Sequence, residues 1–94
     1  MDKWQYLTTI IQASIDNERY QEAISVGKMS GNVPKYSVNT LMVELDSYGN
    51  NGWELVHMEP VQLVGQNGDI GYATHTMGGV LWSNQYFCVF KKKA

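Results

Sequence analysis

Residues 45–58 decide the fold, and they read Leu-Asp-Ser-Tyr-Gly-Asn-Asn-Gly-Trp-Glu-Leu-Val-His-Met. Within this stretch a predicted helix ends, the chain turns and a strand begins. The turn is Asn50-Asn51-Gly52, and it can be tight because Asn and Gly tolerate positive φ. The sequence therefore predicts a helix and a strand joined by a very short linker.

The helix before this turn is predicted over residues 38–48. Its apolar residues recur with helical spacing and form one stripe, namely Val38, Leu41, Met42, Leu45 and Tyr48. Ser37 is expected to cap the helix, because its hydroxyl can accept from the amide of Thr40. Gly49 is expected to end the helix in the left-handed conformation.

The strand after the turn is predicted over residues 53–59. Alternation divides it into two faces, one with Trp53, Leu55 and His57 and the other with Glu54, Val56 and Met58. Pro60 has no amide proton, so it marks a strand end, a bend or a sheet edge. Residues 61–64 can continue the strand beyond Pro60.

Two further strands are predicted near the ends of the sequence, over residues 3–15 and 80–91. The first strand has Trp4, Tyr6, Thr8 and Ile10 on one face and Leu7, Thr9, Ile11, Ala13 and Ile15 on the other. The last strand is best defined over residues 85–90, with Tyr86, Cys88 and Phe90 facing one way and Phe87 and Val89 the other. Because both strands have apolar groups on both faces, we expect one face to be covered by a second copy of the chain.

Residues 16–28 are open to two interpretations. Asp16 and Asn17 form a turn signal, after which residues 19–26 can return as a strand. Alternatively, Asp16 caps a short helix whose apolar positions are Tyr20, Ala23 and Ile24. The hairpin is slightly favoured, and residues 27–34 are expected to be a loop because they contain two glycines and a proline.

A hairpin is also predicted around Asn67-Gly68, a strong two-residue turn signal. Leu63 and Val64 precede this turn and residues 70–72 follow it. Residues 74–76 are expected to complete the returning arm, and Met77-Gly78-Gly79 to break it.

Composition limits the function classes. The chain has 94 residues, which is the size of one domain, and it is 44% hydrophobic and 17% charged. The net charge of −2 gives no general attraction to DNA or RNA. Lys91, Lys92 and Lys93 are interpreted as a solubilising tail that blunts a terminal strand.

The single cysteine, Cys88, excludes an intrachain disulfide and is interpreted as a small core thiol. There is no signal-peptide pattern and no apolar run long enough to span a membrane. We therefore expect a cytoplasmic protein, in a bacterium or in the host of a phage, with no membrane partner.

The chain resembles the bacterial and phage family catalogued as domain of unknown function 4177. Three segments carry the resemblance: Lys3-Trp4-Gln5-Tyr6, residues 45–56 with their Gly-x-x-Gly-Trp-Glu-Leu-Val pattern, and residues 86–92. The resemblance implies a β-α-β-β core and gives no catalytic residues. Typical members are shorter, so residues 16–36 and 61–84 are insertions, in which we expect the particular function to lie.

The expected fold is therefore α+β, a single domain over residues 1–94. An antiparallel-rich sheet of four to six strands is expected, with the helix of residues 38–48 as the one main helix on one face. Trp4 and Trp53 are expected in the core, and His57 is expected to be a hydrogen-bonded structural histidine.

No cluster in the sequence has the spacing of a metal site or of paired acid–base carboxylates. We therefore expect a protein that is not an enzyme and has no cofactor. The candidate ligand-binding residues lie in the insertions and combine hydroxyl, amide, cationic and aromatic groups, namely Lys35, Tyr36, His75, Thr76, Trp82 and Asn84. Such groups suit a phosphate, a ribose or a base, and Trp82 could stack on a ring.

These residues favour a homo-oligomeric binder of a nucleotide-like signalling molecule, which would sequester its ligand as some phage counter-defence proteins do. The alternative is a structural or regulatory interaction module, in which the same aromatic residues form an oligomer or partner interface.

Overall fold

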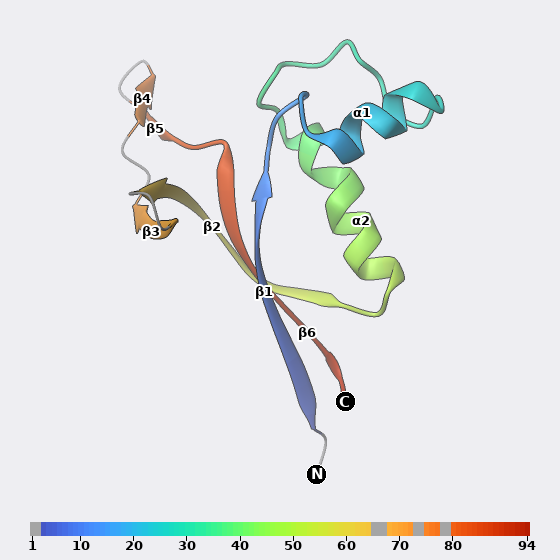
Figure 1. The fold of residues 1–94 in the computed structure, drawn as a ribbon, viewed down its shortest axis with the longest axis vertical. Helices are drawn as coiled ribbons and strands as arrows, with labels where there is room; N and C mark the ends of the chain where they lie inside the picture. The colour runs from blue at the N-terminus through green and yellow to red at the C-terminus, as the bar shows by residue number, and fades with distance from the viewer. Residues whose placement is uncertain (1–2, 65–67, 73–74, 78–79) are drawn as a thin grey trace.

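The computed structural model describes residues 3–64, 68–72, 75–77 and 80–94. The elements are β1 (Trp4–Gln12), α1 (Glu18–Ser25), the 3₁₀ turn η1 (Val38–Leu41), α2 (Met42–Asn50), β2 (Glu54–Val64), β3 (Asp69–Tyr72), β4 (His75–Met77), β5 (Val80–Trp82) and β6 (Gln85–Lys93). Figure 1 shows both helices on one side of the molecule and strands β3, β4 and β5 at the far end on the other side.

The main sheet has four strands in the order β1-β6-β2-β3, and every neighbouring pair is antiparallel. β1 and β2 are therefore parallel to each other, with β6 inserted between them, and α1 and α2 lie in the connection from β1 to β2. β4 and β5 form a separate two-stranded hairpin. The predicted α+β fold with an antiparallel sheet is confirmed.

The core lies between α2 and the sheet. Its buried members are Ile11, Ala13, Leu41, Cys88 and Phe90, and Leu7, Leu45, Tyr48, Trp53, Met58 and Tyr86 pack against them. The rings of Tyr48 and Phe90 stack with centroids 4.5 Å apart. The predicted division of β1 and β6 into two faces is thus confirmed, because the β1 and β6 members of this list are the residues predicted to share a face.

The ends of α2 differ from the prediction. The chain enters through the 3₁₀ turn η1, and Ser37 makes no side-chain cap. Instead, the Thr40 hydroxyl and amide both donate to the Ser37 carbonyl, at 2.6 and 3.1 Å. Gly49 lies inside α2, and Gly52 has φ +88° and ends the helix. The amides of Trp53 and Gly52 donate to the carbonyls of Tyr48 and Gly49, which is the Schellman pattern.

Residues 18–25 form a helix, so the favoured hairpin interpretation of this segment is wrong. The cap is Asn17 and not Asp16, because the Asn17 Oδ1 accepts from the amide of Arg19 at 2.9 Å. The Asn17 Nδ2 donates to Glu44 Oε1 at 2.7 Å, so the cap also ties α1 to α2. Tyr20 is fully buried and its hydroxyl donates to the Ser30 carbonyl.

A β-bulge breaks the predicted alternation in β2. Leu55 pairs with Phe90, whereas His57 pairs with Val89, so Val56 is the extra residue. His57 therefore lies on the opposite face from Leu55, and Met58 returns to the core face. The predicted grouping of Trp53, Leu55 and His57 on one face is wrong for this reason.

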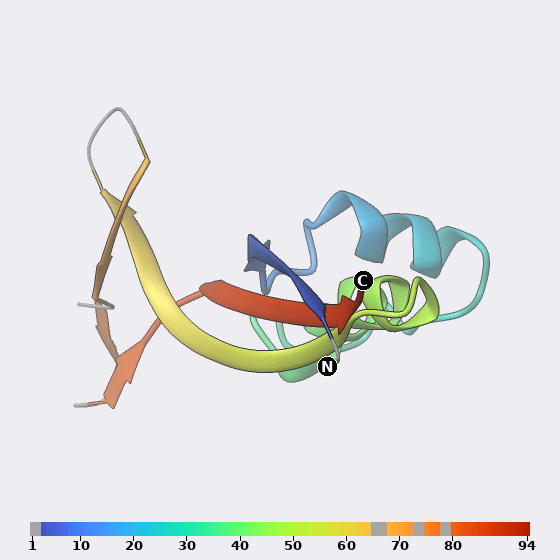
Figure 2. The same ribbon diagram turned by 90° about the horizontal axis from the view of Figure 1, so that it is seen from below.

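The strand continues through Pro60 to Val64, and its residues 61–64 pair with β3, which confirms a hairpin here. The predicted two-residue turn is not confirmed, because the last pair, Val64 with Asp69, leaves four residues between the strands. Residues 65–67 lie outside the described part, and Gly68 has φ +75°. The prediction that residues 74–76 complete the returning arm is wrong for His75 and Thr76, because they belong to β4, which pairs with β5 and not with β2. Figure 2 shows β2 curving strongly between the helix layer and this far end.

Two predictions about the chain ends are also corrected. Trp4 lies on the face away from the helices and is 39% exposed, so it is not a core residue. The three lysines belong to β6, which is a central strand and not a terminal edge. Lys91 Nζ lies 4.5 Å from the Trp4 ring centroid and Lys92 Nζ 4.6 Å from that of Trp53, so each covers an indole.

The molecule is elongated. Its Cα radius of gyration is 14.8 Å, and its principal extents are 48 × 35 × 25 Å. A compact domain of this length has a radius of gyration of about 12.4 Å. Neither helix in the described ranges is both long and apolar enough to cross a membrane.

Candidate functional site

The face of the main sheet opposite the helices, which we call the outer face, carries an unusual share of apolar side chains. Strand pairing places on it Trp4, Tyr6, Thr8, Ile10, Gln12, Glu54, His57, Glu59, Val61, Leu63, Ile70, Gln85, Phe87, Val89, Lys91 and Lys93. Tyr6 is 65% exposed and Ile70 is 55% exposed. No helix of the described chain packs on this face, since both helices lie on the other side (Figures 1 and 2).

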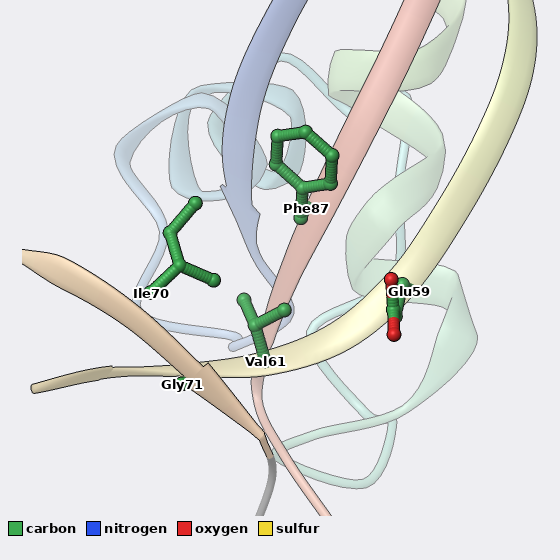
Figure 3. Close-up of a pocket in the computed structure, with 5 residues that line it drawn as sticks. All are labelled: Glu59, Val61, Ile70, Gly71 and Phe87. Carbon is green, nitrogen blue, oxygen red and sulfur yellow. The ribbon is translucent and has the colours of Figure 1, made fainter.

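A pocket of about 420 Å³ opens on the outer face where β2 bends. It is lined by Glu59 and Val61 from β2, Ile70 and Gly71 from β3, and Phe87 from β6. In Figure 3 the side chains of Phe87 and Ile70 point toward the space above Val61. The pocket is therefore walled by apolar groups, with the Glu59 carboxylate as its charged group.

The Glu59 carboxylate has a side-chain hydrogen-bond partner in His57, two residues earlier on the same face. His57 Nε2 lies 3.4 Å from Glu59 Oε2, and both side chains are about half exposed. An exposed pair of this kind contributes little to stability, so it leaves Glu59 available to another donor. The prediction that His57 is hydrogen-bonded is confirmed, but the side chain is not buried.

Ser83 fixes the wall of the pocket. Its hydroxyl is buried, donates to the Val61 carbonyl, and accepts from the Gln85 amide at 3.0 Å. The Leu63 amide donates to the Gln85 side chain at 3.1 Å. These bonds hold the far half of β2 against β6 beyond the end of their regular pairing.

The structure brings together only part of the predicted ligand site. Lys35 and Asn84 approach the same short segment, because the Lys35 carbonyl accepts from Ile15 at 2.8 Å and the Asn84 carbonyl accepts from Ala13 at 2.7 Å. The Lys35 ammonium lies 3.6 Å from Asp16 and 5.5 Å from the Tyr36 ring centroid. Tyr36, and secondly Asp16, raise the pKa of Lys35 above its ordinary value.

The other predicted residues are His75, Thr76 and Trp82. Their backbones form the β4–β5 hairpin, in which His75 pairs with Trp82 and Thr76 pairs with Leu81. Their side chains lie outside the described part of the structure. In Figure 1 this hairpin and the loop that precedes η1 both lie at the upper end of the molecule, with the upper part of β6 between them. That the six residues form one site stays a prediction.

Sequence reasoning missed the pocket residues. Val61, Ile70 and Phe87 look like ordinary strand residues, and Val61 was assigned only to an extension of its strand. One signal was available: Val61 and Ile70 flank a strong hairpin turn, so they were certain to lie near each other. Phe87 can be assigned to the pocket only once the strand order is known, because that order places β6 beside β2.

Cys88 is fully buried in the core, as predicted. Burial, and secondly the nearby Glu44 carboxylate, raise the pKa of its thiol to about 11. The thiol is therefore protonated near neutral pH and has little nucleophilic character. Within the described ranges, no group of three or more His, Cys, Asp or Glu side chains is arranged to hold a metal ion.

Comparison of the chain with protein-family models, with curated proteins and with solved structures gives no match in any of the three. The resemblance to the domain of unknown function 4177 therefore stays a prediction from its three sequence motifs.

Proposed function

We propose that the protein is a non-enzymatic small-ligand binder and that the ligand sits in the pocket on the outer face. The pocket carries the proposal: its volume of about 420 Å³ falls within the range of about 300–1,000 Å³ usual for small-molecule sites. Among the described residues that line it, the apolar walls and the Glu59 carboxylate also match the usual composition of such sites, in which a few polar groups fix the orientation.

The wall chemistry defines the ligand class. Phe87 offers a ring against which a flat group can pack, and Glu59 accepts hydrogen bonds from an amine or amidine edge. A phosphate inside the pocket would be repelled by Glu59. A nucleotide-like ligand would therefore enter with its base, and its anionic part would extend toward the Lys91 ammonium on the same face.

Ligand-dependent thermal stability tests this proposal. A panel of nucleosides, nucleotides and cyclic nucleotides is titrated, since a true ligand at 100 times its dissociation constant stabilises the fold by about 2.7 kcal/mol. Glu59→Gln should weaken binding of amine-bearing ligands by at least tenfold, because it removes the charge of the acceptor. The matched control is Glu54→Gln, which lies on the same face outside the pocket.

The unliganded variants should unfold at the temperature of the wild type, since both glutamates are solvent-accessible. A panel without any stabilising member would overturn the proposal. Equal losses of affinity in the two variants would show that the ligand does not bind in the pocket.

The second candidate is an interaction module that uses the outer face as a protein interface. The exposed aromatic and aliphatic side chains of that face favour it, with Tyr6 at 65% and Ile70 at 55% exposure. Val89 lies at the middle of the face, between Thr8 and His57. Val89→Lys should then abolish association in light scattering, whereas the ligand proposal predicts that assembly is unchanged.

A further inference from the structure

β1 forms one edge of the main sheet and lacks the features that usually protect an edge strand. Its pairing with β6 runs without a bulge from Trp4 to Gln12. The strand reads Trp-Gln-Tyr-Leu-Thr-Thr-Ile-Ile-Gln, so it contains neither a charged residue nor a proline. Natural edge strands usually carry charges, prolines or bulges, because an open edge pairs readily with another strand.

The hydrogen bonds show which backbone groups point to the open side. Lys3 accepts from the Ala94 amide and Ala13 donates to the Asn84 carbonyl, so odd-numbered residues face β6. Residues 4, 6, 8 and 10 therefore direct their N–H and C=O groups away from the sheet. In the described part of the chain, no backbone hydrogen bond joins these groups to another segment.

The open edge has a defined end. Gln12 is the next outward-facing residue, and its carbonyl already accepts from the Asn17 Nδ2 at 3.0 Å. The free ladder thus covers residues 4–10. In Figure 1 the first half of β1 extends below both helices, where neither helix lies over it.

We propose that β1 pairs in antiparallel fashion with β1 of a second copy of this chain, about a two-fold axis at Leu7. Trp4 then lies opposite Ile10 of the second copy, and Tyr6 lies opposite Thr8. Since each hydrogen-bonded pair exchanges two bonds, the four pairs form about eight bonds between the copies. A two-fold axis at Leu7 lets all the free outward-facing N–H and C=O groups of residues 4, 6, 8 and 10 form hydrogen bonds. It leaves the Gln12 carbonyl, which is already hydrogen-bonded, outside the interface.

The side chains suit this self-pairing. Because the strand has no charged residue, no like charges meet across the axis. On the outer face Trp4 meets Ile10, an aromatic with a β-branched residue, which is a favourable cross-strand pair. On the core face the two Leu7 side chains meet at the close, non-hydrogen-bonded position, so the half-buried Leu7 gains cover.

The other edge of the sheet is a poorer partner. β3 is only four residues long and begins with Asp69, so it has the short length and the charge that protect an edge. Pairing through β1 gives a continuous eight-stranded sheet with the helices of both copies on one side. This dimer does not depend on the proposed ligand, because it forms through the open edge of β1, whereas four of the five described pocket residues lie on β2 and β3; the fifth, Phe87, lies on β6 opposite Ile10.

Light scattering after gel filtration tests the pairing. The wild type should have twice the 10.6 kDa mass of one chain. Thr8→Pro removes one outward N–H and none of the bonds to β6, so it should give a folded monomer. The control Thr8→Val keeps the N–H and should remain dimeric. A monomeric wild type at all concentrations, or a dimeric Thr8→Pro, would overturn the proposal.

A cysteine variant gives a second test that does not depend on the folding of Thr8→Pro. At the proposed axis the two Leu7 Cα atoms lie about 4.5 Å apart, within the range that a disulfide spans. Leu7→Cys should therefore form a dimer linked by a disulfide under mild oxidation. Thr9→Cys is the control, because the two Thr9 residues would lie about 14 Å apart, at about 3.4 Å per residue along the strand. Crosslinking of both variants, or of neither, contradicts the register.

Discussion

Gly52 shows how one residue shapes the molecule. It has φ +88°, it closes α2 and it aims Trp53 back at the core. The sequence contains two glycines near the end of α2, Gly49 and Gly52. Helical spacing alone predicts that Gly49 ends the helix, and this prediction is wrong. Gly49 was preferred because Tyr48 is the last member of the apolar stripe, but α2 continues two residues beyond it, to Asn50.

Replacing these two glycines should have opposite effects on stability. Gly52→Ala forces a side chain into the left-handed region and should cost about 1–2 kcal/mol of unfolding free energy. A Cβ there would meet only Lys92 Cδ at 3.9 Å, so the cost is backbone strain and not a clash. Gly49→Ala lies in a helix with nothing within 4 Å of the added Cβ, and should stabilise by about 0.5–1 kcal/mol. Urea unfolding of both variants measures the two changes in unfolding free energy. Equal changes would contradict the assignment of Gly52 as the residue that ends α2.

Cys88 should make stability fall at alkaline pH. Its thiol has a pKa of about 11 in the folded protein against an ordinary value of 9.0. As the pH rises, the unfolded chain therefore loses this proton before the folded protein does. The stability that the protonated thiol contributes to the folded state is present below pH 9 and is lost between about pH 9 and 11. Two pKa units correspond to about 2.7 kcal/mol at most.

Other groups titrate in this range, so the matched variant Cys88→Ala is needed. The free energy of unfolding should fall less steeply between pH 9 and 11 in this variant than in the wild type. Identical slopes would mean that the thiol ionises equally well in the folded state.

At the scale of elements, periodicity predicted the strands well because both faces of β1 and β6 are regular. It failed where a local irregularity decided the outcome. The bulge at Val56 moves His57 to the other face, and no residue type announces it. α1 was missed because Tyr20 and Ala23 are its only buried residues, which is too short a pattern to exclude a strand.

The Asn17 cap should carry much of the stability of α1. Asn17→Ala removes the bond from the Arg19 amide and the bonds to Glu44 and to the Gln12 carbonyl, and should cost about 1–2 kcal/mol of unfolding free energy. Asp16→Ala is the control, because Asp16 makes only an exposed ion pair with Lys35 at 3.6 Å. It should change stability by less than about 0.5 kcal/mol. Thermal unfolding measures both variants. Equal losses of stability would contradict the assignment of Asn17 as the N-cap of α1.

At the scale of the whole molecule, the candidate site depends on strand order. The pocket joins residues from β2, β3 and β6, and the insertion of β6 between β1 and β2 brings Phe87 beside Val61. Nothing in the alternation of apolar residues specifies that order. The segment of residues 61–84, in which the site was expected, does contain Val61, Ile70 and Gly71 of the pocket, but the residues chosen within it were polar and aromatic ones on β4, on β5 and after β5.

Hydrogen exchange should follow the same order of strands. β6 pairs with β1 on one side and β2 on the other, so its amides should exchange most slowly. The amides of β3, a four-residue strand paired only with β2, should exchange fastest among the strands of the main sheet. Mass spectrometry of exchange would measure the difference, and equal protection of β3 and β6 would show that the sheet opens only as a unit.

The central position of β6 also has a consequence for biosynthesis. β1 is made before its partner strand, which ends at Lys93, so 81 residues must be added after Gln12 before the ladder is complete. At about 5–20 residues per second, translation of that interval takes roughly 4–16 s. During this time an uncharged strand rich in aromatic and β-branched residues waits on the ribosome without a partner. Newly made chains on neighbouring ribosomes are thus exposed to one another through β1 before any of them can fold.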